Sequence, residues 1–215
     1  GTDRGIFVLR EPEKFLSSDK VIFERVKIPR NDGTNLADYL LSGIYTTAIC
    51  IDDANRKWIG TQNNGVFLLF EDGKETIHHF TEENSPLLSN YIQTIAINSS
   101  TGSVFFGTSL GLIEYGGDAT EPEKSLSESN IEVYPNPVNP DFDGPVTIKG
   151  MSDKCTVRIV SASGSLIYQG YSNGGTFTWN VTDRNGNRVS SGIYHAIITD
   201  LNNSKSTSVS ITVIR

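Results

Sequence analysis

A strand, turn and strand pattern that recurs in the N-terminal half constrains the fold more than any other feature. The segment Lys57–Phe70 (KWIGTQNNGVFLLF) places aromatic and branched residues on both sides of a polar turn that ends at Gly65. Such residues favour packed strands, and Asn and Gly accept the positive φ of tight turns. The segment therefore predicts a β-hairpin.

The same pattern occurs twice more, as Phe105–Tyr115 (FFGTSLGLIEY) and as Gly1–Leu9 (GTDRGIFVL). Gly65 and Gly111 are 46 residues apart (111 − 65), and Gly5 and Gly65 are 60 apart (65 − 5). A period of about 40–50 residues in a strand-rich sequence is typical of a β-propeller with four strands per blade. An insertion after the first copy explains the longer spacing.

The hairpins organise the strands that we expect around them. In the first, incomplete blade a strand over Val21–Ile28 precedes a polar loop, and Leu36–Leu41 is predicted to form one helical turn after an N-cap at Asn35. We expect no fourth strand in the third blade after Tyr115. The expected strands of the second blade are 46–51, 57–61, 66–70 and 76–80, and those of the third are 92–97, 103–108 and 112–115.

The pattern of apolar and turn residues changes after the polar, acidic stretch 118–130. From Ile131 onward short apolar runs alternate with Gly and Asn turns, which favours an immunoglobulin-like sandwich of about seven strands. Trp179 and Tyr194 are its expected core aromatics. The expected strands are 131–134, 146–149, 156–160, 166–168, 176–180, 192–199 and 206–213. We therefore predict an all-β chain with a partial propeller of two to three blades (1–117), a linker (118–130) and a sandwich (131–215).

Composition excludes some classes of protein. The formal net charge of −7 over 215 residues argues against nucleic acid as a partner, because phosphate binding requires a basic surface. Cys50 and Cys155 are expected to be buried free thiols, with an interdomain disulfide as the alternative. The chain begins within a repeat, so we expect it to be the C-terminal part of a longer protein whose signal peptide lies upstream.

Convergent catalytic groups do not emerge from the sequence. His78 and His79 are neighbours in an expected strand and so point to opposite faces, and His195 is expected to be structural. The segment Asp183–Asn187 resembles the start of a calcium loop, but no Glu follows where a bidentate ligand is needed, so a hairpin turn explains it. We predict no catalytic residue, metal site or cofactor, and no enzymatic activity.

A binding role would fall on one rim of the propeller. The loop between outer and inner strands and the loop between second and third strands share one face of a blade. Amide, Arg and acidic side chains there suit sugar hydroxyls or a protein partner, although surface loops are polar by default. The candidate ligand-binding residues are Arg4, Arg30, Asn31, Asp32, Gln62, Asn63 and Asn64, with Glu82, Glu83 and Asn84 on the same rim.

Two family resemblances follow from these motifs. Trp58–Thr61 with Gly65–Phe67 resembles the propeller blades named for two-component regulators. The sandwich is similar to the C-terminal sorting domain of type IX secretion cargo. The residues that carry the second resemblance are Val133, Tyr134, Pro135, Asn136 and Pro137, then 157–167, Trp179, 183–194 with Gly192 and Tyr194, and 211–215. The combination, together with the loop 30–41, resembles the PorZ family of type IX secretion.

That resemblance implies a non-enzymatic component of the cell surface or outer membrane. Its partners would be outer-membrane secretion and attachment proteins, and its propeller would present a surface for a glycan, lipopolysaccharide or protein. The alternative is a carbohydrate-sensing propeller of a two-component regulatory system. Because a propeller of two or three blades exposes a face that a neighbour should bury, we also predict a homodimer through that face.

Overall fold

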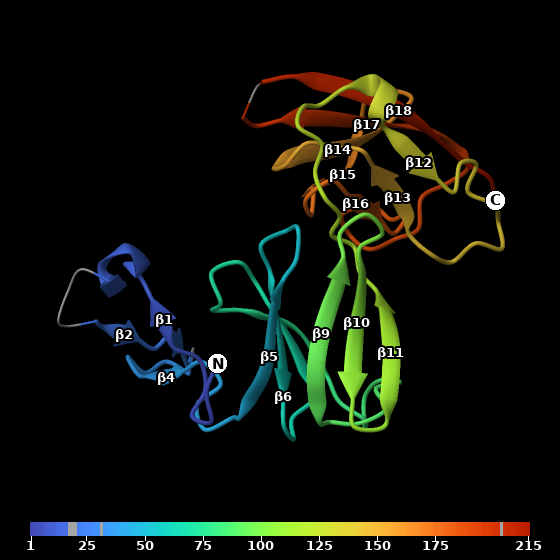
Figure 1. Ribbon diagram of the computed structural model, residues 1–215. Coiled ribbons are helices and arrows are strands. Elements are labelled where there is room, and N and C mark those ends of the chain that lie inside the picture. Colours follow the sequence, from blue (N-terminus) through green and yellow to red (C-terminus); the bar gives the residue numbers. More distant parts are fainter. Residues whose placement is uncertain (17–20, 31, 203) are drawn as a thin grey trace. The chain divides into compact units, whose positions relative to one another are not determined.

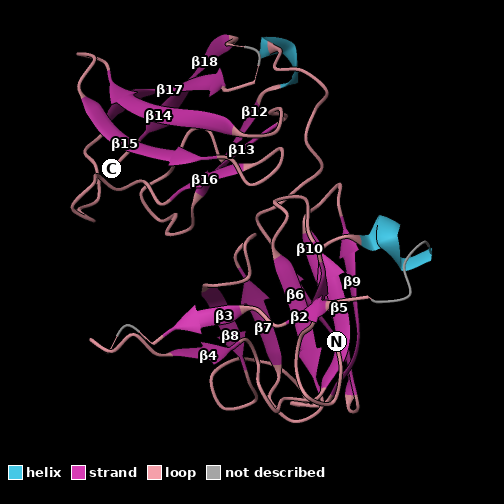
Figure 2. Ribbon diagram, turned by 90° about the vertical axis from the view of Figure 1, so that its left-hand side faces the viewer, coloured by secondary structure: helices cyan, strands magenta, loops and turns pink. Residues whose placement is uncertain are grey.

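The computed structural model describes residues 1–16, 21–30, 32–202 and 204–215. The chain is all-β, as predicted (Figures 1 and 2). The described residues form six open sheets and two short 3₁₀ helices. It forms two compact units, Gly1–Ile97 with Ser103–Gly116 and Asn98–Gly102 with Gly117–Arg215. Among the described residues, neither helix has the length and apolar character needed to cross a membrane.

The first blade consists of two separate hairpin-like pairs. β1 (Val8–Leu9) pairs with β2 (Phe23–Glu24), and β3 (Lys27–Pro29) pairs with β4 (Ala37–Tyr39), with η1 (Pro12–Leu16) after β1. The helical turn predicted over Leu36–Leu41 is wrong. Tertiary pairing overrides the local preference there, because Ile28 lies opposite Asp38 in the ladder and Arg30 bonds the Asp38 carboxylate.

The second blade is the complete one, and its strands match the prediction closely. They form one antiparallel sheet in sequence order: β5 (Thr46–Ile51), β6 (Lys57–Thr61), β7 (Val66–Leu69) and β8 (Thr76–Phe80). β7 is buried on both faces, since Val66, Phe67, Leu68 and Leu69 are all buried. A strand covered on both faces must lie between neighbouring layers, which is the position of a strand inside a stack of blades.

The third blade has three strands, β9 (Ile92–Asn98), β10 (Ser103–Thr108) and β11 (Gly111–Gly116). In the described part of the chain β11 is the outer strand of this sheet. Two apolar clusters join the blades: Trp58 and Leu68 pack with Val104 and Phe106, and Ile59 packs with Ile6. The blades therefore contact one another face to face, as propeller blades do.

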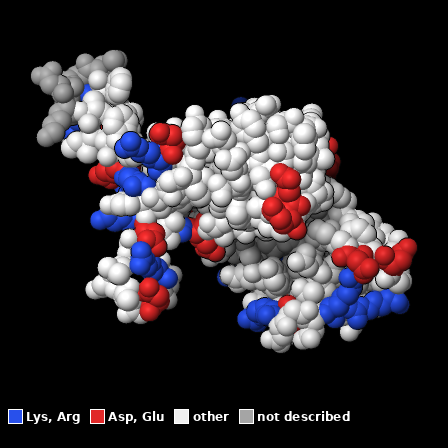
Figure 3. All heavy atoms as spheres, turned by 90° about the horizontal axis from the view of Figure 1, so that it is seen from below, with Lys and Arg blue, Asp and Glu red and all other residues white. Residues whose placement is uncertain are grey.

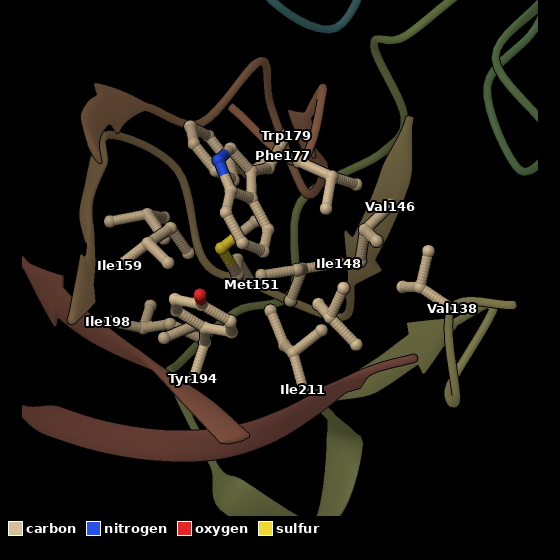
Figure 4. Packing of buried hydrophobic residues seen from close by; sticks show 14 of the residues in the cluster. Val138, Val146, Ile148, Met151, Ile159, Phe177, Trp179, Tyr194, Ile198 and Ile211 are labelled. Carbon is tan, nitrogen blue, oxygen red and sulfur yellow. The ribbon is translucent and has the colours of Figure 1, made fainter. Parts of the chain in front are cut away.

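The second unit is a sandwich of two antiparallel sheets. One has the order β12–β13–β16 and the other β15–β14–β17–β18, and their inner faces share one core (Figure 4). Trp179 and Tyr194 lie in that core, as predicted. The strands are β12 (Glu132–Tyr134), β13 (Val146–Lys149), β14 (Cys155–Ser161), β15 (Leu166–Tyr171), β16 (Phe177–Trp179), β17 (Gly192–Asp200) and β18 (Ser206–Val213).

The residues before β12 pack against the sandwich. Thr120 forms a parallel bridge with Gly174, and its hydroxyl lies 2.6 Å from the Thr176 hydroxyl. Leu126 is 5% exposed and belongs to the sandwich core, and η2 (Glu128–Asn130) lies beside β18. These contacts attach much of the stretch 118–130 to the second unit.

Candidate functional site

The turn between β6 and β7 is built so that three amide side chains project from the rim. The Thr61 hydroxyl donates to the Gly65 carbonyl at 2.8 Å and accepts the Asn64 N–H at 2.9 Å. Gly65 has φ +69°, and a Cβ there would lie 2.0 Å from the Phe80 carbonyl oxygen. Only glycine fits this position. The turn thus leaves Gln62–Asn64 exposed.

Backbone hydrogen bonds hold this turn between two blades. The N–H of Gln62 donates to the Tyr45 carbonyl at 3.0 Å, and the N–H of Gly65 donates to the Asn90 carbonyl at 3.1 Å. Tyr45 and Tyr91 directly precede the inner strands β5 and β9 of the second and third blades and are 50% and 41% exposed. The projecting amides are therefore flanked by two half-exposed aromatic residues.

The tyrosine positions are equivalent in the two blades. In the third blade the N–H of Ser109 donates to the Tyr91 carbonyl at 3.1 Å, just as Gln62 does to Tyr45. The sequence prediction missed both tyrosines, although aligning the repeats would have revealed them, since each follows a loop and precedes the inner strand. Because the position repeats, a half-exposed tyrosine beside the rim is a feature of the blade repeat.

Arg4 lies on the same side of the second blade as Tyr45. Its turn is attached to the start of β5, because the Thr46 N–H donates to the Thr2 carbonyl at 3.0 Å. The Arg4 carbonyl accepts the Gly43 N–H and the Arg25 guanidinium, each at 3.3 Å. The exposed Arg4 side chain therefore neighbours the start of the inner strand.

The loop between β3 and β4 forms its own contacts. The Arg30 guanidinium binds both Asp38 carboxylate oxygens, at 2.9 and 2.7 Å, and holds the pKa of Asp38 below its usual value. The Thr34 hydroxyl and N–H donate to Asp32 Oδ1, which lowers the pKa of Asp32. No bond between these groups and the turn Gln62–Asn64 is found among the described residues. Asn31 lies outside the described residues.

The loop after β8 is bonded mainly to itself. The N–H of Glu82 donates to Asn90 Oδ1 at 3.0 Å, and Asn84 Nδ2 donates to the His79 carbonyl at 2.9 Å. A hydrogen bond from the Thr81 hydroxyl lowers the pKa of Glu83. These contacts hold the loop beside the turn. The polar groups involved already have partners within the protein, so they are less available to a ligand.

The three histidines have structural partners. His79 stacks on Phe67 with 3.9 Å between ring centroids, and its Nε2 lies 2.7 Å from the Asn64 carbonyl oxygen. His195 Nδ1 lies 3.2 Å from the Ser210 hydroxyl on the outer face of the sandwich. His78 lies against Phe80, with 5.3 Å between the centroids. The arrangement brings none of them together with another.

An open cleft of about 1010 Å³ separates the first and second blades. Its floor includes Ile49, Ile59 and Leu69, which belong to the face that the second blade presents to the first. A basic group at its wall is already engaged, since Lys57 Nζ donates to the Asn55 carbonyl at 2.7 Å. We interpret this cleft as an incompletely covered blade interface rather than a ligand site.

The sorting-type motif lies at one edge of the sandwich. Both the Tyr134–Pro135 and the Asn136–Pro137 peptide bonds are cis. The Asn136 carboxamide donates from Nδ2 to the Ser210 carbonyl at 2.9 Å and accepts the Thr212 N–H at 3.0 Å. The Lys149 ammonium lies 5.5 Å from the centre of the Tyr134 ring. The motif thus binds the last strand, a contact that sequence reasoning did not find.

The second part of the motif supports the core. Tyr194 is 7% exposed, its ring packs 5.6 Å from Trp179, and its hydroxyl donates to the Ser190 carbonyl at 2.9 Å (Figure 4). This contact has the form of the tyrosine corner of immunoglobulin-like sandwiches. Burial raises the pKa of Tyr194. Gly192 begins β17 opposite Val213.

The calcium-like segment is a local turn. Asp183 Oδ1 accepts the N–H groups of Asn185 and Asn187 at 2.8 and 2.9 Å, as a side chain does when it organises a hairpin. Among the residues described, no three His, Cys, Asp or Glu side chains gather as metal ligands would. Cys50 and Cys155 are both free thiols.

Charge is mixed on the surface. On the face seen in Figure 3, Lys and Arg side chains lie next to Asp and Glu side chains, and no broad basic patch forms among the described residues there. The mixed charge of the described residues on this face gives no broad basic surface of the kind that binds nucleic acid.

The fold and these motifs define a class: a partial propeller followed by a secretion-type sandwich. Residues 132–212 match the family model described as the secretion system C-terminal sorting domain. The chain is also similar over its full length to PorZ of Porphyromonas gingivalis, an essential bacterial surface component of the type IX secretion system. The two are 37% identical with a TM-score of 0.65. These findings show that the chain is similar to part of PorZ and that its sandwich resembles the sorting domain of secretion systems.

The similarity to PorZ associates the chain with the bacterial surface. It extends over only part of the PorZ chain. The match covers 100% of this chain and 28% of the PorZ chain. No curated protein sequence matches the chain.

Two further solved structures are distant. The extracellular domain of a hybrid two-component system of B. thetaiotaomicron is 12% identical, with a TM-score of 0.32 over 99% of this chain and 31% of that one. Dimeric latent PorU of P. gingivalis is 13% identical, with a TM-score of 0.30 over 52% and 12%. These scores are too low to support an inference.

Proposed function

We propose that the chain is part of a non-enzymatic surface component of type IX protein secretion and cargo attachment. The 37% identity to PorZ over the whole chain carries this proposal. The sandwich would dock to outer-membrane secretion and attachment proteins, and the propeller would present a rigid binding surface. Export through the periplasm under an upstream signal peptide belongs to the same proposal.

A domain exchange tests this role. The part of PorZ that matches this chain is replaced by residues 1–215 in P. gingivalis, and cargo at the cell surface is measured. We expect secretion to be restored, because the similarity to PorZ extends over the whole of this chain. The matched control carries Tyr194→Ala, which removes a core aromatic. A stable, surface-located chimera that leaves cargo inside the cell would contradict the proposal.

The rim of the propeller is the proposed binding surface for a glycan or lipopolysaccharide. Amide side chains can bond pairs of sugar hydroxyls, and half-exposed aromatic rings offer an apolar face to a sugar ring. Gln62–Asn64, flanked by Tyr45 and Tyr91, supplies both chemistries at one place. Arg4 on the same side would favour an anionic substituent.

Binding is tested by titrating the chain with purified lipopolysaccharide and with its oligosaccharide. Tyr45→Ala and Tyr91→Ala should each weaken binding about tenfold, while Tyr171→Ala, which removes a 66%-exposed tyrosine of the sandwich, should not. If all three variants bind as tightly as the parent, the proposal that this rim is the binding site is wrong. The secretion role is tested separately by the domain exchange.

We also propose that the chain self-associates through an open blade face. Leu110 and Leu112 at the outer strand of the third blade are 73% and 68% exposed. Leu112 points away from the interior, because its neighbour Ile113 packs against the core between the blades. Sedimentation should show a dimer that Leu112→Glu abolishes. A monomer at high concentration would contradict this.

The alternative, a carbohydrate-sensing propeller of a two-component regulator, has less support, since the full-length match is to a secretion component.

A further inference from the structure

The outer edge of β18 is covered by Pro135–Val138, a segment that we call the strap. The Asn136 carboxamide bonds the Ser210 carbonyl and the Thr212 N–H, at 2.9 and 3.0 Å. The Val138 N–H donates to the Thr212 carbonyl at 2.8 Å, and the Ile214 N–H donates to the Val138 carbonyl at 2.9 Å. The strap thus satisfies four successive outward backbone groups of the edge.

Half of this cover comes from a single side chain. Val138 forms a parallel bridge with Val213, and two residues earlier a parallel strand would offer a backbone N–H and C=O. The Asn136 carboxamide supplies this donor and acceptor instead. Pro137, which follows it, has no N–H to offer. Only a side chain with both a donor and an acceptor at short reach can take this place.

The covered edge is well suited to pair with its own copy. Ser206–Ile214 (STSVSITVI) contains no charged residue, no Gly and no Pro, and most of its residues favour strands. The N–H and the C=O of Thr212 both point outward, since both bond the strap. Two antiparallel copies centred on Thr212 would therefore exchange both bonds between these two residues.

We propose that the strap is a guard that keeps the β18 edge from pairing with β18 of a second copy of this chain. Releasing Asn136 removes half of the cover and loosens the strap, and once Val138 also leaves the Thr212 carbonyl the edge becomes a two-fold symmetric interface centred on Thr212. Exposed strand edges are templates for such pairing, and proteins cover or blunt them. The strap performs this role here with one carboxamide and one bridged residue.

The first experiment replaces the carboxamide in the full chain. Asn136→Ala is compared with Asn139→Ala, an exposed asparagine for which the structure shows only a backbone contact. Both are made in a Leu112→Glu background, so that the blade face does not contribute. In Asn136→Ala at low concentration, the Thr212 amide should exchange hydrogen at least tenfold faster, while the Ile211 amide, which faces β17, stays protected. Sedimentation should show a concentration-dependent dimer for Asn136→Ala alone.

Charge exchange then tests the register. In the proposed pair the two Thr212 side chains lie directly opposite each other, where like charges destabilise a sheet. Asn136→Ala combined with Thr212→Lys, or with Thr212→Glu, should be monomeric at low salt. Mixing these two proteins should restore the dimer. Ser206→Lys lies outside the bonded edge and should leave association unchanged.

Three outcomes would overturn the proposal. One is a folded Asn136→Ala chain whose Thr212 amide exchanges fast but which stays monomeric. The second is a dimer that Thr212→Lys does not weaken, and the third is a Thr212 amide that exchanges as in the parent. If Asn136→Ala does not fold, Asn136→Asp takes its place, because it keeps the acceptor and removes the donor to Ser210.

Discussion

Replacing Asp52 by Ala should destabilise the propeller unit selectively. Asp52 is buried and directly follows the β5 strand of the complete blade. Its Oδ1 accepts the N–H groups of Ala54 and Arg56 at 3.1 and 3.0 Å. Its Oδ2 accepts Arg56 Nε at 2.8 Å and Trp58 Nε1 at 3.1 Å. One carboxylate thus joins the turn, a buried cation and the core tryptophan.

The magnitude follows from burial of the ion pair. The Asp52 and Arg56 side chains are 2% and 8% exposed, so removing Asp52 takes a carboxylate away from a buried positive charge. Such a loss costs about 3–5 kcal/mol. Asn98 occupies the equivalent position in the third blade, where its Oδ1 accepts the N–H and the hydroxyl of Ser100, both uncharged groups. Asn98→Ala, the matched control, should cost about 0.5–1.5 kcal/mol.

Hydrogen exchange measured by mass spectrometry along a urea series distinguishes the two units, which need not unfold together. The unfolding free energy of a small domain falls by about 1–3 kcal/mol per molar urea. The urea concentration at the midpoint of unfolding should therefore fall by more than about 1 M for peptides of β5–β8 in Asp52→Ala. Peptides of β14 and β17 should not move. A shift no larger than that of Asn98→Ala would refute the reasoning.

Three further predictions concern single groups. Tyr194→Phe should lower the unfolding free energy of the sandwich by about 1 kcal/mol in urea titrations. Burial raises the pKa of Tyr194, so stability should fall as the pH rises above about 10, more in the parent than in Tyr194→Phe; equal pH profiles would count against this. Burial raises the pKa of Cys155, so in the folded chain Cys155 should react slowly with a thiol reagent while the half-buried Cys50 reacts fast. Cys155→Ser should therefore keep the fast phase of the reaction. Gly65→Ala should lower the propeller's melting temperature far more than Gly33→Ala, which has a similar φ but open space around its Cα; similar losses would contradict the role of the Phe80 carbonyl.

Local patterns predicted the strands well. The expected strands of the second blade differ from β5–β8 by a single residue at Phe70. Strand alternation and glycine turns depend on a few neighbouring residues, so they can be predicted from the sequence. The same reason explains the agreement for β12–β18 in the sandwich, where turns such as Asn185–Gly186 separate the strands.

Long-range pairing made the secondary-structure prediction wrong at two places. The single strand expected over Val21–Ile28 is divided into β2 and β3, which pair with β1 and β4 respectively. Leu36–Leu41 contains β4 and not a helical turn, because β3 offers a partner strand that a local pattern does not reveal. The stretch 118–130 is polar in composition, yet Thr120 and Leu126 are buried against the sandwich. The domain boundary near this stretch stays a proposal.

The sequence alone determined the repeat, the change of texture near Ile131 and the motif Tyr134–Pro137, since each is visible in adjacent residues. Only the tertiary structure decided what these parts contact. It bonded the turn Gln62–Gly65 to the backbone of Tyr45 and of Asn90, the residue before Tyr91, and it bound Asn136 to residues 74 and 76 positions later in the chain. A β-sheet satisfies its backbone groups between segments far apart in sequence, so the partner of an edge is a property of the fold.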